Sequence, residues 1–286
     1  MILGIDVGYT YTKTVTEDKE DSFRSTVKAG AMEINKSSIT IEYKGDEYTI
    51  GEKGAYSVDL NKIEDDTFKL CLYTAIAKNM PTDCDEVDLV TGLPIAYYSK
   101  QKHALKESLE GKDVFIKYKG KDRVFAINQC IVFPQSAGLF TVNPELFKGD
   151  IIVIDLGGMT VDVSYFEDMN LVKYATYPMG MLKLYGSVIQ ELNATHSINL
   201  ELLDAEKFIK GNNTEFDVSH IVKQHTEDIL RPIKLEFPYK TSKKVFIGGG
   251  AVGLKKYLPD SERIKESDIF ANARAFYEIG VDKFGY

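Results

Sequence analysis

The sequence has few cysteines and histidines, and neither set has the spacing of a metal site. Cys71, Cys84 and Cys130 form neither a C-x-x-C pair nor a disulfide framework. The four histidines are scattered, and His220 and His225 lie five residues apart, which misses the spacing that places two ligands on one helix face. We therefore expect reduced and mostly buried thiols.

Excess positive charge and long apolar runs are also lacking. Lysine and arginine total 35 against 43 aspartates and glutamates, a formal net charge of −8. This balance disfavours nucleic acid as a direct ligand. No run of about 20 apolar residues is available to span a bilayer, and Asp6 interrupts the apolar N-terminus too early for a signal peptide. The composition therefore predicts a soluble, cytoplasmic, globular protein without a membrane partner.

A chain of 286 residues has room for two domains. Sequence patterns predict strands over residues 1–7, 13–16, 38–43, 47–50, 87–93, 114–118, 123–133, 151–154, 160–166 and 244–247. They predict helices over residues 68–80, 99–110, 181–192, 203–210, 218–236 and 268–279. Strands interleaved with helices indicate an α/β fold.

One short pattern occurs twice. Leu3–Gly8 and Ile152–Gly157 each run from an apolar strand to an aspartate, one apolar residue and a glycine. Asp6 and Asp155 are 149 residues apart, about half of the chain. Glycine lets backbone N–H groups approach an anion, and an aspartate holds Mg²⁺, usually through water, against phosphate oxygens. A single such hairpin is common, but the repeat predicts two similar domains that share one phosphorylated ligand, with Lys13 adding positive charge.

A third glycine-rich segment follows the last predicted strand. Gly248, Gly250 and Gly253 match the G-x-G-x-x-G dinucleotide pattern, with Asp268 a further 20 residues beyond Gly248. Only 33 residues follow Gly253, too few to complete a doubly wound dinucleotide fold. We therefore expect these glycines to approach a flat group such as an adenine, and not a nicotinamide dinucleotide.

The order of the motifs resembles that of the actin-like ATPase superfamily. Ile5–Lys13 resembles its first phosphate motif, and Ile154–Asp162 resembles the second and is the most specific match. Met159 departs from the glycine that related chaperones have at this point. The other matches are Pro134-Gln135-Ser136 to the first connecting segment, Gly248-Gly249-Gly250 to the adenosine motif, Ala271–Ala275 to the second connecting helix and, loosely, Ala205–Lys210 to a nucleoside-binding helix.

The resemblance spans residues 5 to 280 and implies the architecture. We expect an actin-like α/β fold, with two ribonuclease-H-like domains and a nucleotide cleft between them. Domain I would span residues 1–140 and be completed by a helix at 268–286, and domain II would span 141–267. Only 93 residues separate Asp155 from Gly248, so a reduced outer subdomain is expected in the second half.

The resemblance also implies roles for individual residues. Asp6, Asp155 and Gln135 are the implied catalytic residues: the two aspartates hold Mg²⁺ through water, and Gln135 orients the attacking water, since a neutral amide is a poor base. The implied nucleotide contacts are Gly8, Thr10, Lys13, Gly157, Gly158, Thr160, Glu206, Lys210, Gly248, Gly249 and Gly250. ATP or ADP with Mg²⁺ is the implied cofactor, and GTP is left open.

Within the superfamily, the Pro-Gln-Ser and Asn-Ala-Arg segments resemble the ParM/StbA plasmid-segregation filament proteins most. This resemblance implies ATP-driven self-assembly, a DNA-binding adaptor protein on a centromere-like site, and no direct contact with DNA. A small-molecule kinase or phosphotransferase of the same superfamily is the alternative. Such an enzyme would need a catalytic carboxylate aimed at a substrate hydroxyl, and the sequence offers no clear candidate. A chaperone is disfavoured by the short stretch after the adenosine motif.

Overall fold

The computed structural model describes residues 1–31, 38–211, 215–259 and 269–285. The chain forms two compact units, one made of Met1–Val142 with Phe270–Tyr286 and one made of Asn143–Ile269. The boundaries expected from the sequence were 140/141 and 267/268. Among the described residues, no helix is long and apolar enough to cross a membrane.

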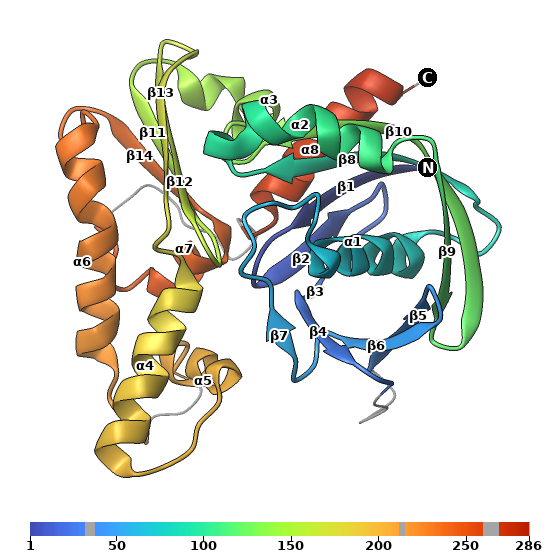
Figure 1. Cartoon of the computed structure of the whole chain (residues 1–286). Coiled ribbons are helices and arrows are strands. Elements are labelled where there is room, and N and C mark those ends of the chain that lie inside the picture. Colours follow the sequence, from blue (N-terminus) through green and yellow to red (C-terminus); the bar gives the residue numbers. More distant parts are fainter. Residues whose placement is uncertain (32–37, 212–214, 260–268, 286) are drawn as a thin grey trace. The chain divides into compact units, whose positions relative to one another are not determined.

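The first unit is built on a ten-stranded mixed sheet (Figure 1). In spatial order its strands are β3 (Glu20–Arg24), β2 (Tyr11–Val15), β1 (Ile2–Val7), β8 (Glu86–Leu93), β10 (Lys121–Pro134), β9 (Lys112–Tyr118), β5 (Ile39–Tyr43), β6 (Asp46–Ile50), β4 (Thr26–Ala29) and β7 (Ala55–Tyr56). The three strands β1, β8 and β10 are parallel neighbours. Their carboxyl ends therefore meet at one edge, where parallel α/β sheets usually bind ligands.

Helices cover both faces of this parallel core. On one face, α1 (Asp66–Asn79) and α2 (Ile95–Leu109) contribute to the apolar cluster that contains Leu3 and Ile5 of β1. On the other face, α8 (Ala271–Phe284) packs against β1 and β8 with Phe276 and Ile279 buried beside Val90 (Figure 1). Alternate residues of β1 thus point toward α1 and toward α8, as the pleat of a strand requires.

The second unit has a four-stranded sheet in the order β13 (Asn170–Tyr177), β12 (Val161–Glu167), β11 (Ile151–Leu156) and β14 (Lys243–Ile247). The helices α4 (Met181–His196) and α6 (Ser219–Glu236) lie side by side (Figure 1) and share one core with β11 and β12. β11 is fully buried, which explains why residues 151–154 are an uninterrupted apolar run.

The segment between α4 and α6 is short of secondary structure. In its described part it holds only the 3₁₀ turn Leu202–Asp204 and the five-residue helix α5 (Ala205–Ile209). This agrees with the expectation that the outer part of the second half is small.

The predicted elements agree with the structure except in a few places. α2 begins at Ile95, four residues before the expected start, because Pro94 lacks an N–H and is tolerated where a helix begins. The edge strand β13 was not predicted, since five of its residues are exposed and carry no alternating pattern. α8 is described from Ala271, so Asp268 lies outside the described residues. The sequence patterns also missed the strands β3, β4 and β7 and the short elements α3 (Leu139–Val142) and 144–147.

Candidate functional site

The two Asp-x-Gly turns have the same backbone geometry. The Gly8 N–H donates to the Tyr11 carbonyl at 3.1 Å, and the Gly157 N–H donates to the Thr160 carbonyl at 3.0 Å. A Cβ atom on either glycine would lie 2.8 Å from that same carbonyl oxygen. Both positions therefore require glycine for a close backbone approach, and the repeat seen in the sequence is a repeat in three dimensions.

Asp6 is the last residue but one of β1 and is only 3% exposed. Its carboxylate accepts a hydrogen bond from Gln135 Nε2 at 2.6 Å and lies 3.2 Å from Lys13 Nζ, its partner across the hairpin. Burial alone would raise the pKa of Asp6, but Lys13, Lys62 and the Gln135 hydrogen bond outweigh it and hold that pKa below its ordinary value. Asp6 is therefore ionised at neutral pH although it is buried.

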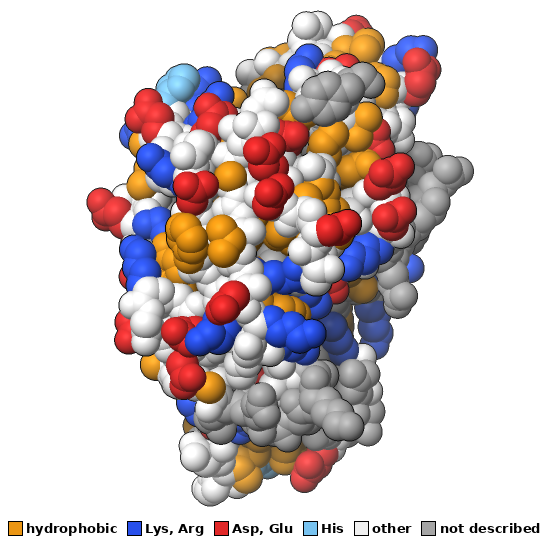
Figure 2. Space-filling view, turned by 90° about the vertical axis from the view of Figure 1, so that its right-hand side faces the viewer, with side chains coloured by type: hydrophobic (Ala, Val, Ile, Leu, Met, Phe, Trp, Pro, Cys, Tyr) orange, Lys and Arg blue, Asp and Glu red, His pale blue; other side chains and the backbone are white. Residues whose placement is uncertain are grey.

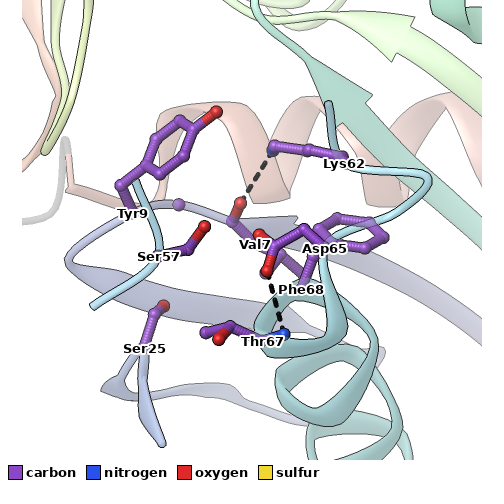
Figure 3. Close-up of a pocket in the computed structure, with 9 residues that line it drawn as sticks. Val7, Tyr9, Ser25, Ser57, Lys62, Asp65, Thr67 and Phe68 are labelled. Atoms are coloured by element: carbon purple, nitrogen blue, oxygen red, sulfur yellow. Dashed lines mark hydrogen bonds between the residues drawn. The ribbon is translucent and has the colours of Figure 1, made fainter. Parts of the chain in front are cut away.

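Lys62 belongs to this cluster and was not identified from the sequence. It is 2% exposed, and its Nζ donates to the carbonyls of Val7 at 2.8 Å and Gly92 at 3.2 Å. These carbonyls lie at the ends of the neighbouring strands β1 and β8. Figure 3 shows the ammonium group reaching Val7 beside the Tyr9 ring, whose centroid is 5.7 Å from Nζ. Lys62 therefore ties two strand ends together next to the first turn.

Tyr9 anchors the first turn from the other side. Its ring is buried and its hydroxyl donates to the Asp59 carbonyl at 3.0 Å. Tyr9, Lys62 and Asp65 line a cavity of about 10 Å³, room for about one water molecule (Figure 3). Thr10 holds the turn through its carbonyl, which accepts from the Ser25 N–H at 2.9 Å. The turn is thus fixed on several sides without any ligand.

Gln135 follows β10, the third of the parallel strands. Its backbone N–H donates to the Leu93 carbonyl at the end of β8 at 2.8 Å. Because the Asp6 carboxylate can only accept, the amide nitrogen of Gln135 must face it. The amide oxygen is then directed elsewhere as a hydrogen-bond acceptor.

The second turn rests on the start of α4. Met181 N donates to the Gly157 carbonyl at 3.0 Å and Leu182 N donates to the Gly158 carbonyl at 2.8 Å. The buried Thr160 hydroxyl donates to Asp162 at 3.1 Å, and Asp162 also accepts from Thr176. The position across the hairpin from Asp155 is thus an aspartate, where the first unit has Lys13.

The glycine-rich segment packs directly on Asp155. Gly248 begins the short helix α7 (Gly248–Leu254) with φ of +85°, and a Cβ there would overlap Asp155 Oδ1. A Cβ on Gly250 would lie 2.7 Å from the Leu156 carbonyl. Gly249 is exposed, and no described atom lies within 4 Å of where its Cβ would be. Asp155 and the predicted adenosine segment are therefore neighbours within the second unit.

Glu206 of α5 pairs with Lys210, the residue that directly follows the helix. Glu206 is buried, and its carboxylate lies 2.7 Å from the half-exposed Lys210 ammonium. The pair has the i,i+4 spacing of a helical ion pair. α5 packs on α4.

The carboxylates suit a cation held through water. The described residues contain no group of three or more His, Cys, Asp or Glu side chains placed to hold a metal ion directly. Each unit instead offers one buried aspartate at a turn, and Asp6 is kept ionised. Mg²⁺ keeps several of its waters and is usually bound through one or two carboxylates plus substrate phosphates, so a single buried carboxylate at a turn is a donor that fits it.

Residues 4–138, most of the first unit, match the protein family described as actin-like proteins, N-terminal domain. Over these residues the first unit is therefore similar to an actin-like N-terminal domain. No curated protein matches the sequence.

Solved structures extend the actin-like fold to the whole chain. The native structure of Ta0583, an archaeal actin homolog, has a TM-score of 0.82 at 20% identity and covers 99% of this chain and 99% of that chain. Its complex with ADP has a TM-score of 0.81 at 19% identity, with the same coverage. A 15-stranded ParM filament from Clostridium botulinum has a TM-score of 0.78 at 22% identity and covers 98% of this chain and 99% of that chain. The predicted actin-like fold is confirmed.

The environments of two adjacent glycines in this actin-like chain give a matched test. Gly248→Ala should lower the free energy of unfolding by about 2–4 kcal/mol, because alanine disfavours positive φ and its Cβ would displace Asp155. Gly249→Ala should leave it unchanged or raise it by up to about 1 kcal/mol, because the site is open and alanine favours the helix. Urea unfolding measures both, and equal effects would contradict the geometry.

Lys62 can be tested by a substitution that keeps length but removes charge. Lys62→Met should lower the free energy of unfolding by about 2–3 kcal/mol at neutral pH, because two buried carbonyls lose a charged donor. Lys100→Met, at an exposed lysine of α2, is the control and should have little effect.

The pH dependence of the same variant tests the charge effect. Because the pKa of Asp6 lies below its ordinary value, its ionisation stabilises the fold above that value, and this contribution is lost as pH falls through the folded-state pKa. Without Lys62 this contribution is smaller. The difference in free energy of unfolding between wild type and Lys62→Met should therefore shrink as pH is lowered from about 7 to about 3. A difference that stays constant over this range would show that Lys62 does not act on Asp6.

Proposed function

We propose that this chain is an actin-like ATPase that binds ATP with Mg²⁺, assembles into filaments and hydrolyses the nucleotide. The observation that carries the proposal is the pair of matching turns, each closed by a glycine N–H and each preceded by a buried aspartate. Such a duplicated arrangement suits a ligand with several phosphate groups.

The phosphate contacts follow from the turns. The N–H groups of Gly8 and Gly157 close the turns. The N–H groups of the residues that follow them, 9–10 and 158–160, would donate to phosphate oxygens. Lys13 is held against Asp6 at 3.2 Å and would place a compact positive charge at the phosphates. When bound, Mg²⁺ would neutralise developing phosphate charge, and Asp6 and Asp155 would hold its waters.

Gln135 is the proposed water-orienting residue. Its amide nitrogen is bound to Asp6 at 2.6 Å, which leaves the amide oxygen as the acceptor for a water proton. A neutral amide orients a water without abstracting its proton, and catalysis of phosphoryl transfer consists mostly of positioning and electrostatic stabilisation. This favours slow hydrolysis in the isolated chain.

The nucleoside is assigned to the glycine-rich segment. Gly249 is exposed and its surroundings are open, so a flat ring can approach the backbone there. Glu206 and Lys210 are proposed to lie along the nucleoside. The ADP complex of the archaeal actin homolog supports a nucleotide ligand for this fold, and GTP is the competing nucleotide to be tested.

Self-assembly is the second part of the proposal, and the ParM filament among the similar structures supports it. We further propose that the filament acts in DNA segregation through a DNA-binding adaptor protein on a centromere-like site. The net charge of −8 supports an indirect link to DNA. On the face shown in Figure 2, acidic side chains are interspersed with the basic ones.

Hydrolysis is tested at Gln135. Gln135→Ala should keep the affinity for ATP within about threefold of wild type and lower the rate of phosphate release by about tenfold to a hundredfold, because the water loses its positioning group. Gln129→Ala, at an exposed glutamine of β10, the strand that Gln135 follows, is the matched control and should hydrolyse ATP normally. Normal phosphate release by Gln135→Ala would remove this residue from the mechanism.

Assembly is tested by sedimentation of the full chain with Mg²⁺. Material should pellet with ATP and with a non-hydrolysable analogue, remain soluble with ADP, and return to solution after ATP is hydrolysed. A chain that stays monomeric with all three nucleotides would refute the filament. A parallel screen for phosphate transfer to small-molecule hydroxyls separates the filament from a kinase of the same fold.

A further inference from the structure

Ser136, the residue after Gln135, has a backbone conformation that needs support. Its φ is +67°, and it is completely buried. Residues other than glycine rarely adopt positive φ, and they keep it only where the surrounding structure holds them. Because Ser136 directly follows Gln135, its conformation sets the direction of the chain at the proposed water-orienting residue.

The support comes from the distant end of the sequence. Asn272, near the start of α8, is 5% exposed, and its Oδ1 accepts a hydrogen bond from the Ser136 N–H at 3.2 Å. This bond joins residues 136 positions apart within the first unit. Asn272 belongs to the Asn-Ala-Arg segment that resembles the second connecting helix.

α8 packs so tightly against the residues around Gln135 that it can act as a rigid support. A Cβ on Gly138 would lie 2.9 Å from the Ala275 side chain, and a Cβ on Gly92 would overlap the Phe276 ring and lie 3.2 Å from Gln135 Cγ. The Phe276 ring and the aliphatic part of Gln135 therefore meet at the same glycine. The helix cannot shift toward this strand end without overlap.

We propose that Asn272 is a positioning residue that aims Gln135 by fixing the backbone of Ser136. Gln135 is then held at both ends: its own N–H is bonded to the Leu93 carbonyl, and the next N–H is bonded to Asn272. With the backbone fixed, the amide reaches Asp6 at 2.6 Å. The effect on hydrolysis rests on the proposed ATPase function, but the effect on the orientation of Gln135 does not.

Two substitutions of similar size separate hydrogen bonding from packing. Asn272→Leu fills the site without an acceptor, whereas Asn272→Asp keeps an oxygen that accepts from the Ser136 N–H, whether or not the carboxyl is ionised. Glu278→Ala, at an exposed position on the same helix, is the control for changes in α8 itself. Thermal unfolding of each variant reports whether it folds.

The first readout needs no nucleotide. The side-chain amide resonance of Gln135, identified by its loss in Gln135→Ala, should move or broaden in Asn272→Leu and keep its position in Asn272→Asp and Glu278→Ala. An unchanged resonance in Asn272→Leu would overturn the proposal. If Asn272→Leu does not fold, Asn272→Asp decides alone, because a displaced resonance there would show that the acceptor oxygen is not what holds Gln135.

The second readout is kinetic. Asn272→Leu should lower kcat by about tenfold or more with ADP affinity within about threefold, since only the orientation of the water is lost; Asn272→Asp should stay near the wild-type kcat. Equal loss in both variants would overturn the acceptor role. If the wild type does not hydrolyse ATP but the resonance behaves as expected, the proposed ATPase fails and the positioning of Gln135 stands.

Discussion

The first unit depends on one buried charge, the ionised carboxylate of Asp6. Moving a carboxylate from water into a protein interior costs on the order of several kcal/mol, so its partners must be held in place. Lys13 comes from the neighbouring strand, Gln135 from the end of β10, and Lys62 adds positive charge from the segment before α1. The parallel order of β1, β8 and β10 brings these groups, far apart in the sequence, to one sheet edge.

The two turns share a backbone but differ in electrostatics. The Asp6 turn faces a lysine across its hairpin, whereas the Asp155 turn faces Asp162, whose oxygens are occupied by the hydroxyls of Thr160 and Thr176. Asp155 instead has the glycine-rich segment at its side, where Gly248 leaves space for its carboxylate. The shared backbone geometry agrees with the proposal that both turns bind phosphate. The residues beside them differ: the first turn has Lys13, and the second has the glycine-rich segment proposed to bind the nucleoside.

Sequence patterns anticipated the parts of the site that are local. Each turn consists of an aspartate and a glycine two residues apart, and the glycine triplet is contiguous, so each can be recognised within a short stretch of sequence. Close backbone contacts require glycine at Gly8, Gly157, Gly248 and Gly250. Lys62 could not be found in this way, because a lysine in a polar segment has no pattern that distinguishes burial from exposure. The bond from Ser136 to Asn272 was equally hidden, since it depends on how α8 packs. The strand β13 was missed because an exposed edge strand needs no apolar alternation.

The energetics of the Asp6 cluster indicate why a folded protein would keep it. Buried ion pairs are weak evidence for stability, because well-packed apolar residues of similar volume often serve as well or better. A cluster that combines Asp6, Lys13 and a fully buried Lys62 with a glutamine held on both sides is therefore hard to explain by stability alone. Its groups are an anion kept ionised, cations close by and an amide with its oxygen turned away, which are the groups that positioning a polyphosphate and a water requires. The cost of burying these charges therefore supports the proposal that the cluster binds a ligand.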